Sequence, residues 1–423
     1  MLSKLNLTRI RQNFPDRALP DVRAAMEREM NEKWPRTGIR PGETVAVTVG
    51  SRGIANLALM TWTICNVIKS HGAVPVIIPA MGSHGGGTAE GQKGVLAMYG
   101  VTEEAMGARI DQRMNVRFIG KSPEGLKIYV AKSALMADHI IVFNRIKAHT
   151  DFIGDIESGL CKIMAIGLGK IAGATFYHRA VLDFGCSRAV EAAGRYVAAN
   201  SKLAMGLGII EDAYDNTALI KALLPDELVE EEKKLLLISK QWMGRLPFKD
   251  MHCLIVDRIG KDISGTGMDP NVTGRLQSIY NERNLPEPRI RRIYARSLTP
   301  VSEGNATGMG RADFINRRYF YDRIDFKYTY VNCFAGLSME NGKMPLVVEN
   351  DQVGLEMSRN ACGLVPTAKL RLVWIRDTLT LSEVLVSNAL LPECREREDL
   401  SVLGSHPKMD FDAEGYLPES VVF

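Results

Sequence analysis

Three side chains suited to proton transfer, nucleophilic attack or metal binding lie within one stretch of thirty residues. His149, Lys162 and His178 occupy HTDFIGDIESGLCKIMAIGLGKIAGATFYH, whose other residues are largely small or apolar. Imidazole is the natural general base at neutral pH, and a desolvated lysine amine is a nucleophile or a covalent anchor. The sixteen residues from Lys162 to His178 fit a helix, a turn and a returning segment. The stretch therefore predicts a base, an amine and an imidazole converging on one pocket.

Each of these residues also has a purely structural interpretation. His149 is equally a loop histidine with local hydrogen bonds; if it is a base, the carboxylate of Asp151 or Asp155 is expected to fix its tautomer. Lys162 is equally a lysine whose amine reaches solvent along an apolar surface. Lys170 competes with Lys162 for the reactive role, but a lysine near the end of a helix simply complements the helix dipole.

A second histidine motif follows an apolar run earlier in the chain. His84 lies in GSHGGG (82–87), where Gly85 and Gly86 let the backbone approach a ligand closely and can turn N–H groups inward as an anion nest. The motif lacks the GK[ST] ending of a Walker loop, and a flexible turn with a solvated histidine explains it equally well. Two cations are candidates for holding a substrate carboxylate, namely Arg52 and, later in the chain, Lys261 beside the turn SGTG.

The elements that must position these residues alternate between strand and helix. Short apolar, β-branched runs predict buried parallel strands at 44–50, 73–80, 138–150 and 203–212. Amphipathic stretches predict helices at 20–33, 55–70, 158–170, 183–199 and 225–243, the last with its Glu/Lys run on a solvated face. This order indicates a doubly wound α/β sheet, in which ligands collect at the carboxyl ends of the strands. Arg52, His84 and His149 all follow such ends.

A second α/β series begins at MHCLIVD (251–257), with further strands expected at 289–298, 330–337, 344–349 and 369–375. We therefore predict two α/β domains with largely parallel sheets and an active-site cleft between them. The N-terminal domain comprises residues 1–248, with the tail 400–423 packing back on it. The C-terminal domain comprises residues 249–399.

Composition removes several classes of function. The net charge of +4 over 423 residues, without a basic stripe interleaved with aromatics, argues against nucleic-acid binding. No apolar run reaches the roughly 18 residues that a membrane span needs, and the first twenty residues lack the features of a signal peptide. Seven cysteines without a CxxC pair fit reduced thiols in a cytoplasm. The chain has no HExxH motif and no histidines at i, i+4, so any metal needs ligands from another molecule.

Taken together, these residues resemble the nickel-dependent lactate racemase family and its wider group of 2-hydroxyacid racemase and epimerase homologues. The resemblance rests on SRGIAN after the first strand, the loop GSHGGGTAEGQ, the His149 segment, the Lys162-to-His178 spacing and the DPN segment (269–271). It implies a nickel pincer nucleotide, a pyridinium mononucleotide with thioamide and thiocarboxylate groups, as cofactor. It also implies partner enzymes that mature this cofactor.

The resemblance assigns a role to each candidate. Lys162 would be the covalent tether, His178 the protein ligand of nickel, and His84 and His149 the acid/base pair on opposite faces of the substrate. A 2-hydroxy acid would be oxidised to its 2-keto acid by hydride transfer and reduced again from the other face, while the cofactor handles the hydride. Arg52 would hold the carboxylate.

The sequence departs from the lactate-specific pattern in its first-strand motif and its glycine-rich histidine loop, which favours a larger or more polar substrate such as a sugar acid. Two alternatives stay open from the residues themselves. One is a hydroxy-acid lyase or dehydratase that uses His84 and His149 without the pincer cofactor. The other is a non-catalytic anion-binding or maturation protein on the same fold.

Overall fold

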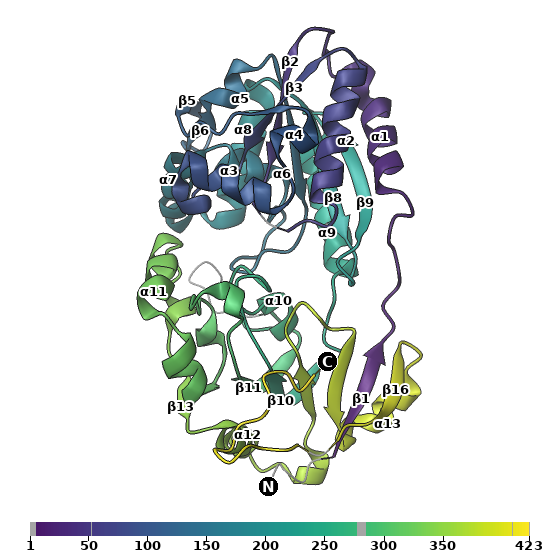
Figure 1. Ribbon diagram of the computed structural model, residues 1–423, viewed down its shortest axis with the longest axis vertical. Coiled ribbons are helices and arrows are strands. Elements are labelled where there is room, and N and C mark those ends of the chain that lie inside the picture. Colours follow the sequence, from purple (N-terminus) through teal and green to yellow (C-terminus); the bar gives the residue numbers. More distant parts are fainter. Residues whose placement is uncertain (1–5, 52, 277–284, 408, 423) are drawn as a thin grey trace. The chain divides into compact units, whose positions relative to one another are not determined.

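The computed structural model describes residues 6–51, 53–276, 285–407 and 409–422, and the chain forms two compact units (Figure 1). The N-terminal unit comprises residues 16–243. The C-terminal unit comprises residues 244–423 together with residues 1–15. Each unit is built on its own largely parallel sheet covered by helices, which confirms the predicted α/β class.

The sheet of the N-terminal unit has the strand order β4–β3–β2–β7–β8–β9. Every pairing in it is parallel except that of β9 with β8. All nine residues of β8 are buried, as expected of a strand with both faces covered. A separate antiparallel hairpin joins β5 and β6. The strands are β2 (Thr44–Val49), β3 (Val74–Pro79), β4 (Arg109–Ile110), β5 (Val116–Lys121), β6 (Lys127–Ala131), β7 (His139–Arg145), β8 (Leu203–Glu211) and β9 (Thr217–Leu223).

The helix expected at 158–170 is broken in the structure. A short α6 continues into a π-helical turn (Ile163–Gly167), and the chain then bends by 108° into α7. A Cβ on Gly167 would lie 2.6 Å from the carbonyl oxygen of Ala80, so this glycine lets the turn pack directly on the chain after β3. The helices of this unit are α1 (Val22–Lys33), α2 (Leu57–Ser70), α3 (Ala89–Met98), α4 (Glu103–Met106), α5 (Lys132–Met136), α6 (Leu160–Lys162), α7 (Lys170–Phe184), α8 (Cys186–Asn200) and α9 (Leu228–Trp242).

Among the described residues, no single helix has the length and apolar character needed to cross a membrane. The bent pair Leu160–Gly167 and Lys170–Phe184 meets those criteria only when its two parts are counted together.

The sheet of the C-terminal unit has the strand order β13–β12–β11–β10–β14–β15–β1–β16, with β13 to β14 parallel and the remaining pairings antiparallel. Its strands are β1 (Leu7–Gln12), β10 (Asp250–Val256), β11 (Arg289–Ala295), β12 (Phe314–Asn316), β13 (Leu346–Val348), β14 (Leu372–Ile375), β15 (Glu383–Ser387) and β16 (Leu400–Ser405). Its α-helices are α10 (Pro270–Thr273), α11 (Phe326–Ala335), α12 (Asp351–Asn360) and α13 (Leu391–Glu396).

The two ends of the chain differ from the sequence-based expectation, because both belong to the C-terminal unit. β1 pairs with both β15 and β16, so the first strand and the tail complete one sheet. The apolar side chains of Leu417, Val421 and Val422 are buried in the core of this unit together with Trp374. Residues 400–423 therefore do not complete the N-terminal domain as predicted, since their apolar side chains find their burial elsewhere.

The expected strand at 330–337 is also wrong, because this segment lies in and after α11. Its aromatic and β-branched composition suggested a strand, but Asp325 caps a helix by accepting a hydrogen bond from the backbone N–H of Tyr328. The buried residues of α11 are Thr329 and Cys333, which are four apart and face one side. Helical spacing of the buried positions thus outweighs β-propensity here.

Candidate functional site

The candidate residues of the N-terminal unit follow the carboxyl ends of three adjacent parallel strands. β3, β2 and β7 lie side by side in the sheet, and the loops after them carry His84, Ser51 and His149 respectively. Ser51 Oγ and His84 Nδ1 form a short hydrogen bond that joins the first two loops. Arg52, the predicted carboxylate-binding residue, lies outside the described residues.

The His149 imidazole has a defined contact at each ring nitrogen. The backbone N–H of Asp151 donates to Nδ1 at 3.0 Å, and Lys162 Nζ lies 2.5 Å from Nε2. Phe152 stacks on the ring with centroids 4.2 Å apart. Because Nδ1 accepts a hydrogen bond, a neutral ring has its proton on Nε2. The backbone N–H of Asp151 thus favours this tautomer of the neutral ring.

The bend between α6 and α7 brings Lys162 and His178 into electrostatic range of each other. Burial lowers the pKa of His178, and the positive charge of Lys162 lowers it further, while Asp151 opposes the shift. An imidazole that stays neutral keeps its lone pair for a metal ion. Among the described residues no group of three or more histidine, cysteine or acidic side chains is placed to hold a metal by itself.

The glycine loop around His84 is compact, and part of it packs against the chain's own backbone. Gly85, Gly86 and Gly87 all have φ near +65°, the left-handed region that favours glycine. A Cβ on Gly85 would lie 2.6 Å from the backbone of Gly91, so the close approach at Gly85 is to the start of α3. Open space lies beside Gly86, which leaves this residue as the better candidate for contact with a ligand.

Three buried charged residues support these loops; the sequence did not single out Glu157 or Glu232, and it placed Lys170 at the wrong end of a helix. Glu157 accepts the backbone N–H of His149 at 2.6 Å, and Lys170 is fully buried at the start of α7. Glu232 of α9 accepts the backbone N–H of Cys161 at 2.8 Å, beside Lys162, and burial raises its pKa to about 7.

A signal for Glu232 was present in the sequence. Leu228, Glu232, Leu235 and Ser239 recur at helical spacing and are all buried, so Glu232 belongs to the apolar stripe of α9 and not to its solvated face. Lys170 was expected to complement the end of a helix, but it lies at the beginning of one. The broken helix explains this error.

An ion pair between the ends of β7 and β8 fixes the segment that follows β2. Arg145 at the end of β7 pairs with Glu211 at the end of β8. The same carboxylate accepts the backbone N–H of Ala55 at 2.7 Å, which fixes the chain shortly after Ser51. Burial and the charge of Glu211 raise the pKa of the neighbouring Asp215 to about 6.

Lys261 lies in the C-terminal unit and is held by its own surroundings. Its Nζ donates to the carbonyl of Gly265 at 2.6 Å and to Asn332 Oδ1 at 2.8 Å. Its backbone N–H donates to Ser302 Oγ at 2.9 Å. The amine is thus oriented by α11 and by the SGTG turn that the sequence had placed beside it.

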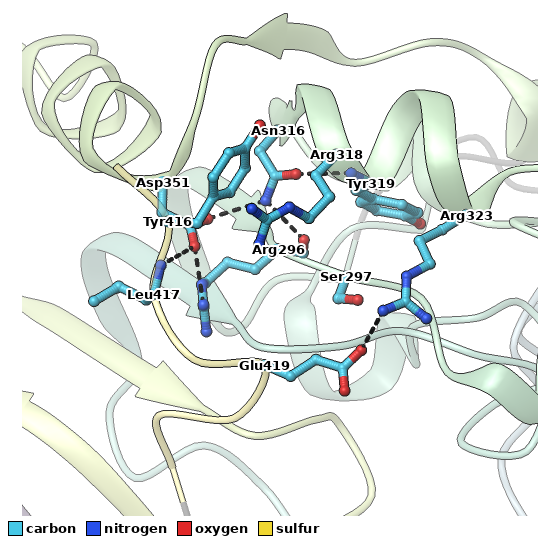
Figure 2. Close-up of a pocket in the computed structure, with 10 residues that line it drawn as sticks. All are labelled: Arg296, Ser297, Asn316, Arg318, Tyr319, Arg323, Asp351, Tyr416, Leu417 and Glu419. Carbon is cyan, nitrogen blue, oxygen red and sulfur yellow. Dashed lines mark hydrogen bonds and ion pairs between the residues drawn. The ribbon is translucent and has the colours of Figure 1, made fainter. Parts of the chain in front are cut away.

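Polar residues at the corresponding strand ends of the C-terminal unit form a cluster, and three of them, Arg296, Asn316 and Asp351, line a polar cavity of about 200 Å³ (Figure 2). Asp257, Arg296, Asn316 and Asp351 follow or end strands β10, β11, β12 and β13. Arg296 pairs with both aspartates, and Asp351 also accepts from Asn316. The tail covers this edge, with the backbone N–H of Leu417 donating to Asp351. The polar groups here chiefly bind the chain's own C-terminal segment.

Comparisons with known proteins support the earlier resemblance. Residues 8–188 match the family model described as the lactate racemase N-terminal domain, which confirms the predicted family over this part of the chain. No curated protein matches the sequence.

Two solved structures share the fold. The lactate racemase apoprotein from Thermoanaerobacterium thermosaccharolyticum has a TM-score of 0.50 at 11% identity, covering 88% of this chain and 99% of that one. A Thermotoga maritima protein solved by structural genomics has a TM-score of 0.52 at 13% identity, covering 84% and 96%.

Proposed function

We propose that the protein is a racemase or epimerase of a 2-hydroxy acid that works with a nickel pincer nucleotide, a proposal supported by the match of residues 8–188 to the lactate racemase N-terminal domain. The observation that carries the proposal is the 2.5 Å contact between Lys162 Nζ and His149 Nε2, with His178 on the returning helix in electrostatic range of the same amine. The candidate amine thus contacts the candidate base and lies within electrostatic range of the candidate nickel ligand.

The residues present fit such a cofactor. The chain offers one desolvated imidazole, His178, and a half-buried amine, Lys162, and no complete set of metal ligands among the described residues. That donor set suits a group that brings most of its own donors and needs one imidazole and one covalent attachment point. When bound, a nickel pincer nucleotide would supply a reversible hydride acceptor for C2 of the substrate.

The chain's own part is proton transfer and positioning. His149 is proposed to exchange a proton with the substrate hydroxyl through Nε2, the nitrogen that faces Lys162 and not the Asp151 backbone. To accept a proton there, a neutral ring needs its own proton on Nδ1, so the base form is the other tautomer from the one that the Asp151 contact favours. His84 is proposed to serve the opposite face, with Ser51 orienting its ring. Two such groups are needed because racemisation runs in both directions.

The remaining assignments concern binding. We propose that Arg52 and Lys261 hold the substrate carboxylate and that the backbone at Gly85 and Gly86 contacts the cofactor. A sugar acid is the proposed type of 2-hydroxy acid, and enzymes that build the cofactor are the proposed partners.

The mass of the intact protein tests the proposal. Protein produced in a host that makes the cofactor should exceed the mass of the bare chain by a nucleotide-sized adduct, and peptide mapping should find that adduct on Lys162. Lys162→Arg should abolish it. Lys202→Arg is the matched control, because Lys202 donates to the carbonyl of Ala137 at the other end of β7. Absence of the adduct and of nickel from the wild-type protein in that host would overturn the proposal and favour a lyase or a binding protein.

Nickel content tests the assignment of His178. His178→Ala should lose most of the bound nickel while Lys162 still carries the adduct, since the covalent bond is made by a different residue. His139→Ala is a suitable control, because His139 pairs with Glu43 at the start of the strand and not at its carboxyl end. Unchanged nickel occupancy in His178→Ala would contradict the ligand assignment.

A further inference from the structure

Each of the two proposed acid/base histidines is held by its own buried charged side chain. We propose that Lys170 and Glu157 are positioning residues, Lys170 for His84 and Glu157 for His149. Neither side chain takes part in the proposed chemistry. Each of the two residues fixes its own histidine independently of the other. The effect of this positioning on catalysis rests on the proposed function, whereas the positioning itself does not.

Lys170 links the start of α7 to the end of β3. Its fully buried Nζ donates to the carbonyl of Pro79 at 2.5 Å and to Gln92 Oε1 at 3.1 Å. Burial lowers the pKa of Lys170 to about 8, and the nearby carboxylate of Asp111 opposes this. Its φ of +53° is unusual for a residue other than glycine, and such a conformation persists only where the surroundings determine it.

Gln92 carries this link on to the histidine loop. Its side-chain Nε2 donates to the carbonyl of Gly82 at 2.9 Å and to the carbonyl of His84 at 3.3 Å. Gln92 is itself fully buried, so these donors have no competing water. The loop is thereby held on both sides of Ser83, and the His84 ring is kept within reach of Ser51.

Glu157 plays the equivalent part for the other histidine. Its Oε2 accepts the backbone N–H of His149 at 2.6 Å, and its Oε1 accepts that of Gly154 at 3.0 Å. Lys240 of α9 balances its charge, with Nζ 2.6 Å from Oε1. Glu157 is buried, so its carboxylate lies inside the unit, while the side chain of Lys240 reaches it from a partly exposed position.

The two arrangements share no residue. One joins β3, α3 and α7, and the other joins the loop after β7 to α9. A side chain that merely stabilised the unit would loosen both histidines together when it was replaced. A positioning residue instead disturbs its own histidine and leaves the other unchanged.

Nitrogen-15 NMR of the histidine side chains, recorded over a pH series on protein without cofactor, separates these outcomes. Gln92→Glu keeps an acceptor for Lys170 but loses the donor to His84, so the Nδ1 signal and the pKa of His84 should shift, by about 0.5 pH unit or more, with His149 unchanged. Glu157→Gln should produce the reverse pattern. Lys170→Met should reproduce the effect of Gln92→Glu, and Gln92→Met is a second variant should the buried carboxylate prevent folding.

Lys202→Met, which also removes an amine-to-carbonyl contact from the same unit, should leave both histidines unchanged. The proposal is overturned if either variant shifts both histidines equally, or if folded variants shift neither. In the loaded enzyme the same changes should lower kcat by about 10- to 100-fold, as expected for a misplaced catalytic group. Because the NMR experiment needs neither cofactor nor substrate, failure of the proposed racemase chemistry would not affect its outcome.

Discussion

The two units use the carboxyl ends of their parallel strands in opposite ways. In the C-terminal unit, every carboxylate oxygen of Asp257 and Asp351 accepts a hydrogen bond from Arg296, a neutral side chain or the backbone of the tail. In the N-terminal unit, two buried charged residues, Lys170 and Glu232, lack such balance, whereas Glu157 is paired with Lys240. Within the part of the chain that the structure describes, Lys170 donates hydrogen bonds to two neutral groups, and one buried oxygen of Glu232 has no hydrogen-bond partner.

The difference sets a structural edge apart from the edge at which the proposed function is located. At the C-terminal edge, carboxylates whose oxygens all accept hydrogen bonds and that are covered by the chain's own tail leave little for a ligand. Groups held in unbalanced, desolvated positions with shifted pKa values cost stability, and proteins keep such groups mainly at functional sites. The contrast therefore supports the 16–243 unit as the location of the proposed active site. Several experiments can test this contrast.

The largest effect is expected from deleting the tail. Removal of residues 416–423 exposes the core around Leu417, Val421 and Val422, at a cost of about 1.5–3 kcal/mol for each side chain. Hydrogen exchange followed by mass spectrometry should show lost protection in the 244–422 unit and unchanged protection in residues 16–243. Loss of protection in residues 16–243 would instead restore the original prediction that the tail completes the N-terminal domain.

A smaller effect is expected at the centre of the structural edge. Arg296→Met leaves Asp257 and Asp351 buried without their cation, which should lower the free energy of unfolding by about 3–5 kcal/mol. Arg323→Gln is the control on the same cavity, because its pair with Glu419 is exposed and should contribute only about 0.2–1 kcal/mol. Urea denaturation measures both. If the two substitutions lowered the free energy of unfolding equally, the buried ion pairs of Arg296 would contribute no more to stability than an exposed pair. The C-terminal edge would then not be a stabilising element.

Much of the sheet edge was predictable from the sequence, because parallel strands have a local signature. The runs at 44–50, 73–80 and 138–150 are apolar and β-branched, and the residues after them necessarily meet at one edge. The approach of Lys162 and His178 was also predictable as a helix with a return. The break itself depends on packing of Gly167 against Ala80, which spacing does not reveal.

The buried charged residues that hold the histidine loops were harder to predict from the sequence. Glu157 and its partner Lys240 are 83 residues apart, and nothing local in the sequence pairs them. The tail was misassigned for the same reason, since its pairing with β1 joins opposite ends of the chain. Long-range partners are decided by which apolar surfaces remain to be covered, and one sequence does not contain that information in a local pattern.

The most specific test of the contrast concerns Glu232. Burial raises its pKa from 4.5 to about 7, so between these values the folded protein holds a proton that the unfolded chain has released. The free energy of unfolding must therefore fall as pH rises through this window, by at most about 3 kcal/mol from this group. Glu232→Gln removes the titration and should flatten that part of the pH profile, whatever its effect on stability at a single pH.

The matched variant is Glu157→Gln, whose carboxylate is balanced by Lys240 and should leave the slope of the wild type between pH 5 and 7 in place. Unfolding free energies from urea titrations at several pH values supply both profiles. If Glu232→Gln left the slope of unfolding free energy against pH unchanged, the Glu232 carboxylate would be as well stabilised by its partners as those of Asp257 and Asp351. The two edges would then differ in what covers them and not in how their charges are balanced.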